Sequence, residues 1–128
     1  MGQPVVHFEI IGSEPGKLRE YYAELFNWEF DTDSSVAPGV SDAGNYGFVR
    51  PMPEGTPGQI PGGVGGGAEF APHAVFYVGV PNVEAALLKA ESLGGTRVTG
   101  PMKRPDGGLV VAHFTDPEGT LVGLAGPA

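Results

Sequence analysis

Apolar residues along this chain come either in short β-branched runs or at helical spacing, and the order of these patterns repeats once. Residues 4–11 predict a β-strand, and apolar side chains then recur at helical spacing over 18–26. Residues 28–33 and 45–51 predict two more strands, and 58–66 predict a weaker one because a proline and several glycines interrupt it. The first half therefore predicts the order β-α-β-β-β.

The second half repeats this order. Residues 73–80 predict a strand, Asn82 has the side chain of a helix N-cap, and Gly94-Gly95 is typical of a helix end. Three strands are then predicted, over 96–100, 109–115 and 120–125. A tight DPEG turn joins the last two, and FTDPEGT echoes FVRPMPEGT of the first half. The sequence therefore predicts one domain, 1–128, of two βαβββ modules at about 4–66 and 70–126.

The run GGVGGGAEFAPH, residues 62–73, is the most unusual local composition. Its glycine spacing fits a dinucleotide-binding fingerprint, but that fingerprint opens a helix, and here Pro72 and a predicted strand follow. A P-loop is excluded as well, since no Lys-Ser or Lys-Thr pair follows the glycines. We therefore expect a glycine-rich connector over 62–68 that leads to His73.

Composition narrows the class of protein and its partners. With 128 residues, 41% hydrophobic and 17% charged, the chain is expected to form one globular domain. A net charge of −8 disfavours nucleic acid and anionic membranes as partners. The absence of cysteine excludes thiol nucleophiles and cysteine metal sites. No targeting segment or membrane-length apolar run is apparent, so a cytoplasmic location is expected.

Three segments give the chain a family resemblance: YYAELFNWEF at the end of the first predicted helix, GGTRVTGP after the second, and FTDPEGTLVGL near the C-terminus. Together with the two modules, they resemble the vicinal oxygen chelate superfamily, which includes glyoxalase I, bleomycin-resistance proteins and extradiol dioxygenases. The resemblance implies an α+β fold in which the two modules form a cupped mixed sheet. It does not identify the reaction, because this fold carries lyases, isomerases, transferases, dioxygenases and plain binding proteins.

In the metal-dependent members of that superfamily, four side chains from the two modules hold one divalent ion. The resemblance places His7 and His73 at the two histidine positions, and it places Gly62 or Gly63, and Gly123, at the two carboxylate positions. Glycine supplies no ligand, and two imidazoles alone form a weak site. The resemblance therefore implies either a degenerate site for Zn, Ni, Mn or Fe, or no metal, with the histidines hydrogen-bonded in a pocket.

Two further side chains would strengthen such a site. Period-two alternation puts Val111 and His113 on one face of a strand, so His113 would add a third imidazole. Glu9 shares a face with His7 and would add a carboxylate, or act as a general base if burial raises its pKa. The pocket wall is expected to include Glu9, Val75, Tyr77, Val111 and Gly123.

Two functions from different classes follow from the resemblance. The first is a protein that acts on a small molecule in the cup between the modules, as a metal-dependent lyase or isomerase or as a dioxygenase-like enzyme. The alternative is a metal-free binding protein of the antibiotic-binding type, whose acidic, glycine-lined groove takes a hydrophobic or cationic compound. A relic that binds no ligand is a third reading. A homodimer is expected in each case, because members with one pair of modules usually associate.

Overall fold

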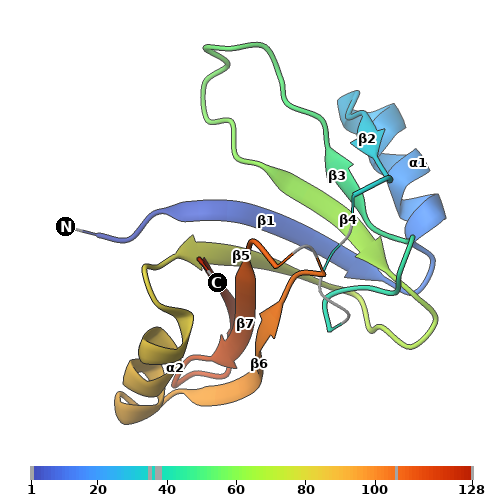
Figure 1. Cartoon of the computed structure of the whole chain (residues 1–128). Helices are drawn as coiled ribbons and strands as arrows, with labels where there is room; N and C mark the ends of the chain where they lie inside the picture. Colours follow the sequence, from blue (N-terminus) through green and yellow to red (C-terminus); the bar gives the residue numbers. More distant parts are fainter. Residues whose placement is uncertain (1, 35, 37–38, 106, 128) are drawn as a thin grey trace. The chain divides into compact units, whose positions relative to one another are not determined.

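A computed structural model describes residues 2–34, 36, 39–105 and 107–127 (Figure 1). The chain divides into two compact units. One unit is His7–Ala74, called the first module below. The other combines the residues before His7 with Val75–Ala128, and is called the second module.

The first module has four strands and one helix. They are β1 (Val5–Gly12), α1 (Pro15–Phe26), β2 (Phe30–Asp31), β3 (Gly47–Val49) and β4 (Gly62–Gly66). The strands are ordered β2-β3-β4-β1, with β1 and β4 parallel and the other pairs antiparallel. Helix α1 lies against β4. Helix α1 connects β1 to β2, and the two antiparallel pairs β2–β3 and β3–β4 then bring β4 back parallel to β1.

The second module repeats this plan. Its elements are β5 (His73–Gly79), α2 (Val83–Ser92), β6 (Thr96–Lys103), β7 (Val110–Thr115) and β8 (Leu121–Gly126). The strands are ordered β5-β8-β7-β6, and only β5 and β8 are parallel. The α+β class and the two βαβββ modules predicted from the sequence are therefore confirmed. The predicted strands differ mainly in length, since β2 and β3 are shorter than expected and β6 is longer.

Local signals explain where the second module's elements begin and end. The Asn82 side chain accepts a hydrogen bond from the Ala85 amide at 2.8 Å, which caps α2 as expected. In the DPEG turn, the Asp116 carboxylate accepts from the amides of Glu118 and Thr120 at 2.9 and 3.0 Å. Gly119 closes the turn with a φ of 92°, a conformation that favours glycine. The turn is structural, as its sequence predicts.

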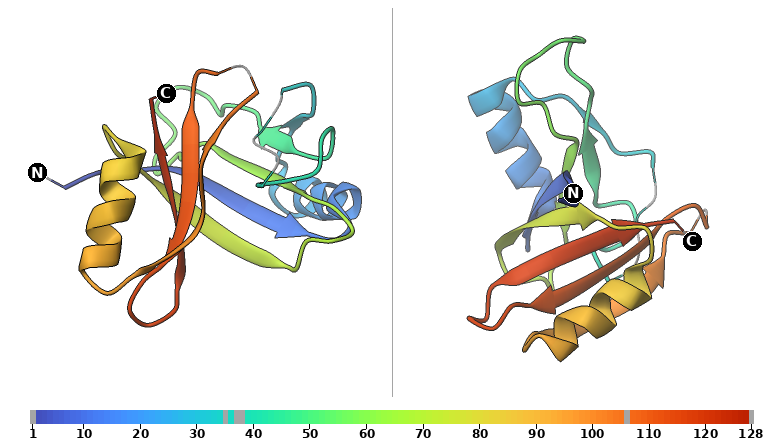
Figure 2. Two further views of the ribbon diagram at one scale, coloured as in Figure 1. Left: turned by 60° about the horizontal axis from the view of Figure 1, so that its bottom comes forward. Right: turned by 90° about the vertical axis from the view of Figure 1, so that its left-hand side faces the viewer.

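The two modules have cores of different chemistry. In the second module, α2 packs on β6, β7 and β8 (Figure 2). The buried side chains there are aliphatic: Val83, Leu87, Val110, Ala112 and Leu124. In the first module, Trp28 contacts the rings of Phe8, Tyr22 and Phe26 at centroid distances of 5.1 to 5.7 Å. These rings form an aromatic seam between helix and sheet.

The glycine-rich run forms a paired strand over 62–66, which agrees with the weaker strand predicted over 58–66 and corrects the expectation of a connector over 62–68. Strand β4 occupies 62–66 between β1 and β3, and the link to β5 runs over 67–72. A side chain on Gly62 would overlap the ring of Phe8, which lies across β4 on the helix side. The glycines are therefore needed because aromatic rings of neighbouring strands cover this strand.

Candidate functional site

A hydrogen-bonded cluster of three side chains lies on one face of the first module. Alternation along β1 puts His7 and Glu9 on the same face. The Tyr46 hydroxyl donates to Glu9 Oε1 at 3.0 Å and lies 2.9 Å from His7 Nε2. Glu9 and Tyr46 are only 3% and 2% exposed, whereas His7 is partly exposed. The tyrosine hydroxyl thus bridges the histidine and the carboxylate.

Glycine explains how Tyr46 reaches β1 from the start of β3. In the sheet register, Gly63 lies between Glu9 of β1 and Phe48 of β3. A Cβ on Gly63 would overlap the Tyr46 ring, and one on Gly65 would lie 2.6 Å from it. The ring therefore crosses β4 over two positions that carry no side chain, and it contacts Phe48 at a centroid distance of 4.8 Å.

Burial also sets the charge of the histidine. Removing His7 from water lowers its pKa from 6.5 to about 4, because the imidazolium form loses hydration. His7 is therefore neutral at pH 7, with one nitrogen protonated and the other carrying a lone pair. A neutral imidazole next to a phenol and a carboxylate is suited to proton transfer.

The second module contains a similar crossing. Gly123 of β8 lies between Tyr77 of β5 and His113 of β7. A Cβ on Gly123 would overlap the Tyr77 ring, whose hydroxyl lies 2.7 Å from His113 Nε2. On the far side, Thr99 Oγ1 lies 2.8 Å from His113 Nδ1. His113 is 6% exposed, so both of its nitrogens are engaged by hydroxyl groups inside the module.

His73 has a different environment from the other two histidines. It is exposed at the start of β5, and its Nδ1 lies 2.9 Å from the Ala71 carbonyl, which can only accept. In β5 the buried residue two positions before Tyr77 is Val75, as His7 stands two positions before Glu9 in β1.

These residues do not fit the metal site that the resemblance implies. The tyrosine rings fill the space that carboxylate ligands would need at Gly63 and Gly123. His7 Nε2 is bonded to Tyr46, and His73 Nδ1 is bonded to the Ala71 carbonyl. Among the residues that the structure describes, no group of three or more His, Cys, Asp or Glu side chains is placed to hold a metal ion. A divalent ion needs such a set.

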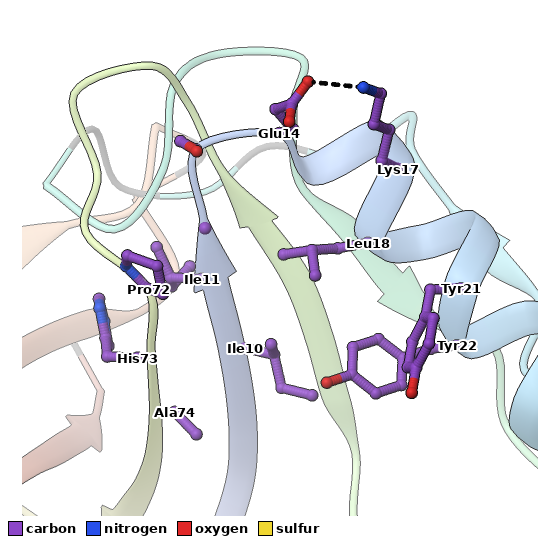
Figure 3. Close-up of a pocket in the computed structure, with 12 residues that line it drawn as sticks. Ile10, Ile11, Glu14, Lys17, Leu18, Tyr21, Tyr22, Pro72, His73 and Ala74 are labelled. Atoms are coloured by element: carbon purple, nitrogen blue, oxygen red, sulfur yellow. Dashed lines mark ion pairs between the residues drawn. The ribbon is translucent and has the colours of Figure 1, made fainter.

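A cavity of about 640 Å³ lies between β1 and α1 of the first module (Figure 3). Ile10, Leu18, Tyr21 and Tyr22 give it an apolar wall. Its rim holds His73 and the ion pair between Lys17 and Glu14, whose Nζ and Oε1 are 3.0 Å apart. None of the predicted pocket residues lines this cavity: Glu9, Val75, Tyr77, Val111 and Gly123.

Sequence reasoning did not single out Tyr46 or Thr99. Both contribute through strand register, which brings together residues that are 37 and 14 positions apart in the chain. The sequence contains one signal for Tyr46. The run of glycines in β4 leaves space above the strand for a large side chain from a neighbouring segment. Glu9 and His113, which were singled out as site residues, are 3% and 6% exposed. Within the described part of the chain, no helix is long and apolar enough to cross a membrane.

The chain is similar to a known protein family and to several solved structures. The model of the Glyoxalase/Bleomycin resistance protein/Dioxygenase superfamily matches residues 5–124. A variant of Streptomyces coelicolor methylmalonyl-CoA epimerase, solved with 2-nitronate-propionyl-CoA, has a TM-score of 0.63 at 14% identity, over 98% of this chain and 95% of that one. A hypothetical protein from Bacillus halodurans C-125 has a TM-score of 0.66 at 12% identity, over 100% and 96%.

Another similar structure is the methylmalonyl-CoA epimerase from Mycobacterium tuberculosis. Its TM-score is 0.58 at 14% identity, over 97% of this chain and 87% of that one. At such identities the likeness concerns the fold alone. No curated protein matches the chain.

Proposed function

Because this chain belongs to the Glyoxalase/Bleomycin resistance protein/Dioxygenase superfamily, we propose that it is an isomerase-type enzyme that moves a proton on a small molecule without a divalent ion. The observation that carries the proposal is the Tyr46 hydroxyl bonded to both His7 and Glu9 in the first module. These groups can take up, pass on and return a proton. The tyrosine also fills the place where a metal carboxylate would stand.

A carbonyl compound with an acidic C–H is the substrate class that suits this cluster. Removing a proton next to a carbonyl leaves an enolate, whose charge needs hydrogen-bond donors when no metal supplies it. Solved structures of the same fold include methylmalonyl-CoA epimerases in complex with 2-nitronate-propionyl-CoA and with methylmalonyl-CoA.

The test is exchange of substrate hydrogen with solvent deuterium, followed by NMR. The protein is treated with a chelator and incubated in D₂O with a panel of 2-substituted acyl-CoA thioesters and simpler carbonyl compounds. We expect exchange that chelation leaves unchanged and that His7→Gln and Glu9→Gln abolish. Exchange that requires added Zn²⁺, Ni²⁺, Mn²⁺ or Fe²⁺, or calorimetric metal binding lost in His7→Ala/His73→Ala, would contradict the metal-free proposal.

The cavity between β1 and α1 favours a second candidate, a metal-free binding protein. Its volume of about 640 Å³ is in the range of small-molecule sites, and its wall is apolar. The Ile10 side chain alternates with Glu9 along β1, so this wall belongs to the other face of the strand. A thermal-shift screen with apolar compounds tests this function. A hit that Leu18→Trp abolishes, while deuterium exchange is absent, would favour binding over catalysis.

We further propose that the chain works as a homodimer. Support comes from α1, where Tyr21, Leu25 and Phe26 are 61%, 55% and 52% exposed. Large apolar side chains gathered on one helix are typical of protein contact surfaces. Light scattering after size exclusion should give twice the mass of 13.2 kDa. A monomeric mass at working concentrations would contradict this proposal.

A further inference from the structure

We infer that the cavity between β1 and α1 binds an uncharged aromatic compound with a hydrogen-bonding group, and that the ion pair on its rim disfavours charged ligands. This inference deepens the second candidate function and rests on it, because it names the ligand class of that binding site. It does not involve the His7 cluster, since Ile10 in the cavity wall alternates with Glu9 along β1.

The cavity exists because α1 covers a strand that has almost no side chains. Helix α1 lies against β4, which is glycine apart from Val64, and Pro15 is the buried residue of this helix. Helix α2 of the second module buries Val83 and Leu87 against strands with aliphatic side chains. A strand of glycines gives a helix little to pack on. The space between α1 and β1 is left as a cavity of about 640 Å³ (Figure 3).

The aromatic part of the wall suits a flat ring. Tyr21 and Tyr22 both line the cavity and form a corner, with ring centroids 5.1 Å apart and ring planes at 88°. Tyr22 is fixed by its neighbours, because its ring stacks on Phe26 at 5.9 Å and contacts Trp28 at 5.7 Å. A ring that enters the corner can stack on one tyrosine and meet the other edge-on. These are the two arrangements that aromatic pairs prefer.

The tyrosine hydroxyls can bond to a polar group of the ligand. In the part of the chain that the structure describes, neither the Tyr21 nor the Tyr22 hydroxyl is bonded to another residue. A phenolic hydroxyl both donates and accepts hydrogen bonds, and the Ser13 hydroxyl also lines the cavity. A hydroxyl, carbonyl or amide group on the ligand can therefore be bound without any charge.

The charges on the rim balance each other. Lys17 Nζ and Glu14 Oε1 are 3.0 Å apart, and these two residues carry one full charge of each sign. A ligand carboxylate would compete with Glu14 for the lysine, and a ligand ammonium would compete with Lys17 for the glutamate. An uncharged ligand leaves the pair intact. Because the two side chains are 77% and 66% exposed, we expect a preference of only about fivefold.

The test uses three probes that share one ring and differ in charge: 4-nitrobenzyl alcohol, 4-nitrobenzoate and (4-nitrobenzyl)trimethylammonium. Nitroaromatic rings quench tryptophan fluorescence, and Trp28 is the single tryptophan of the chain, next to Tyr22. The titration is run at pH 8, at which a free imidazole is mostly uncharged. N-acetyltryptophanamide gives the quenching that occurs without binding. We expect the alcohol to bind about fivefold more tightly than either charged probe.

Single substitutions on the rim should change the preferred charge. Lys17→Gln leaves Glu14 without its partner, so we expect the ammonium probe to gain affinity relative to the alcohol. Glu14→Gln leaves Lys17 without its partner and should favour the benzoate instead. Tyr21→Ala should weaken all three probes. Leu25→Ala is its matched control, because Leu25 is 55% exposed on the same helix, does not line this cavity and belongs to the same proposed dimer surface.

Three results would overturn the ligand class: a charged probe that binds the wild type as tightly as the alcohol, a charge preference that neither rim variant changes, or binding that Tyr21→Ala leaves as it was. Thermal-shift hits that Leu18→Trp abolishes would still support a binding protein in each of these cases. The absence of both hits and quenching would refute the second candidate function together with this inference. The isomerase is judged separately, by deuterium exchange.

Discussion

A tyrosine ring crosses a glycine in the sheet of each module, but the two tyrosines start from different strands and reach different partners. In the first module, Tyr46 comes from the start of β3 and ends between His7 and Glu9. In the second, Tyr77 comes from β5 and ends on His113. In both modules, then, a glycine lets a tyrosine ring cross a strand. In the first module the tyrosine hydroxyl is bonded to a histidine and a carboxylate. In the second it is bonded to a histidine that a threonine hydroxyl also contacts.

The strands beneath the rings differ as well. Strand β4 has glycine at four of its five positions, with rings over both faces, whereas β8 has glycine only at its centre and its end and otherwise aliphatic residues. Glycine contributes no apolar area, so the first module depends on its aromatic rings for burial. The second module has an aliphatic core under α2 instead. Substitution of an aromatic residue should therefore lower the unfolding free energy more in the first module than in the second.

The largest effect is expected where a side chain is added under a ring. Gly123→Ala would overlap the ring of Tyr77 near its Cγ, which cannot swing away, whereas Gly63→Ala would overlap Tyr46 near its hydroxyl end. We expect Gly123→Ala to cost about 3 kcal/mol of unfolding free energy and Gly63→Ala about 2 kcal/mol. Denaturant unfolding measures both.

The double variants Gly63→Ala/Tyr46→Ala and Gly123→Ala/Tyr77→Ala are the controls for this prediction. If each glycine is required because a ring crosses it, the added methyl group should cost much less once the ring is absent. Additive losses in both pairs would contradict the steric account. A favourable coupling in only one pair would show that the two crossings are not equivalent.

The next largest effect is a pH dependence of stability that comes from His7. Its pKa in the folded protein, about 4, is below the unfolded value of 6.5. Between these values the unfolded chain binds more protons, so the contribution is full above about pH 6.5 and is lost as the pH falls toward 4. We expect a loss of up to about 3 kcal/mol relative to His7→Gln. Equal pH slopes for the two proteins would contradict it.

A smaller effect is expected from removing each hydroxyl while keeping the ring. Tyr46→Phe deletes a hydroxyl that is bonded to both Glu9 and His7, and we expect a loss of about 2 kcal/mol in the unfolding free energy. Tyr77→Phe deletes a hydroxyl bonded to His113, and about 1 kcal/mol is expected. The two variants are each other's control in denaturant unfolding. A larger loss for Tyr77→Phe would refute the contrast between the modules.

The smallest effect is expected at Thr99, on the far side of His113. Thr99→Val keeps the shape of the side chain and removes one hydroxyl partner, so we expect a loss of about 1 kcal/mol or less. Thr99→Ser keeps the hydroxyl and is the matched control for this position. A Thr99→Val variant that is as stable as the wild type would show that His113 does not depend on this bond.

The sequence by itself determined the order and type of the elements. Periodic apolar residues, the Asn82 cap and the DPEG turn act within a few residues, so each can be recognised without knowledge of the fold. His7 and Glu9 could also be placed on one face, because alternation along a strand is local. The glycines of β4 are visible in the sequence too, but the sequence does not show the aromatic rings that require them.

Only the tertiary structure decided what those glycines do. Tyr46 lies 37 residues from Glu9 and 39 from His7, and it reaches both because β4 lies between β3 and β1 with no side chain in the way. Such contacts depend on strand order and register, which combine segments that are far apart along the chain. For the same reason, spacing along the chain could not show that His113 is bonded by Tyr77 and Thr99.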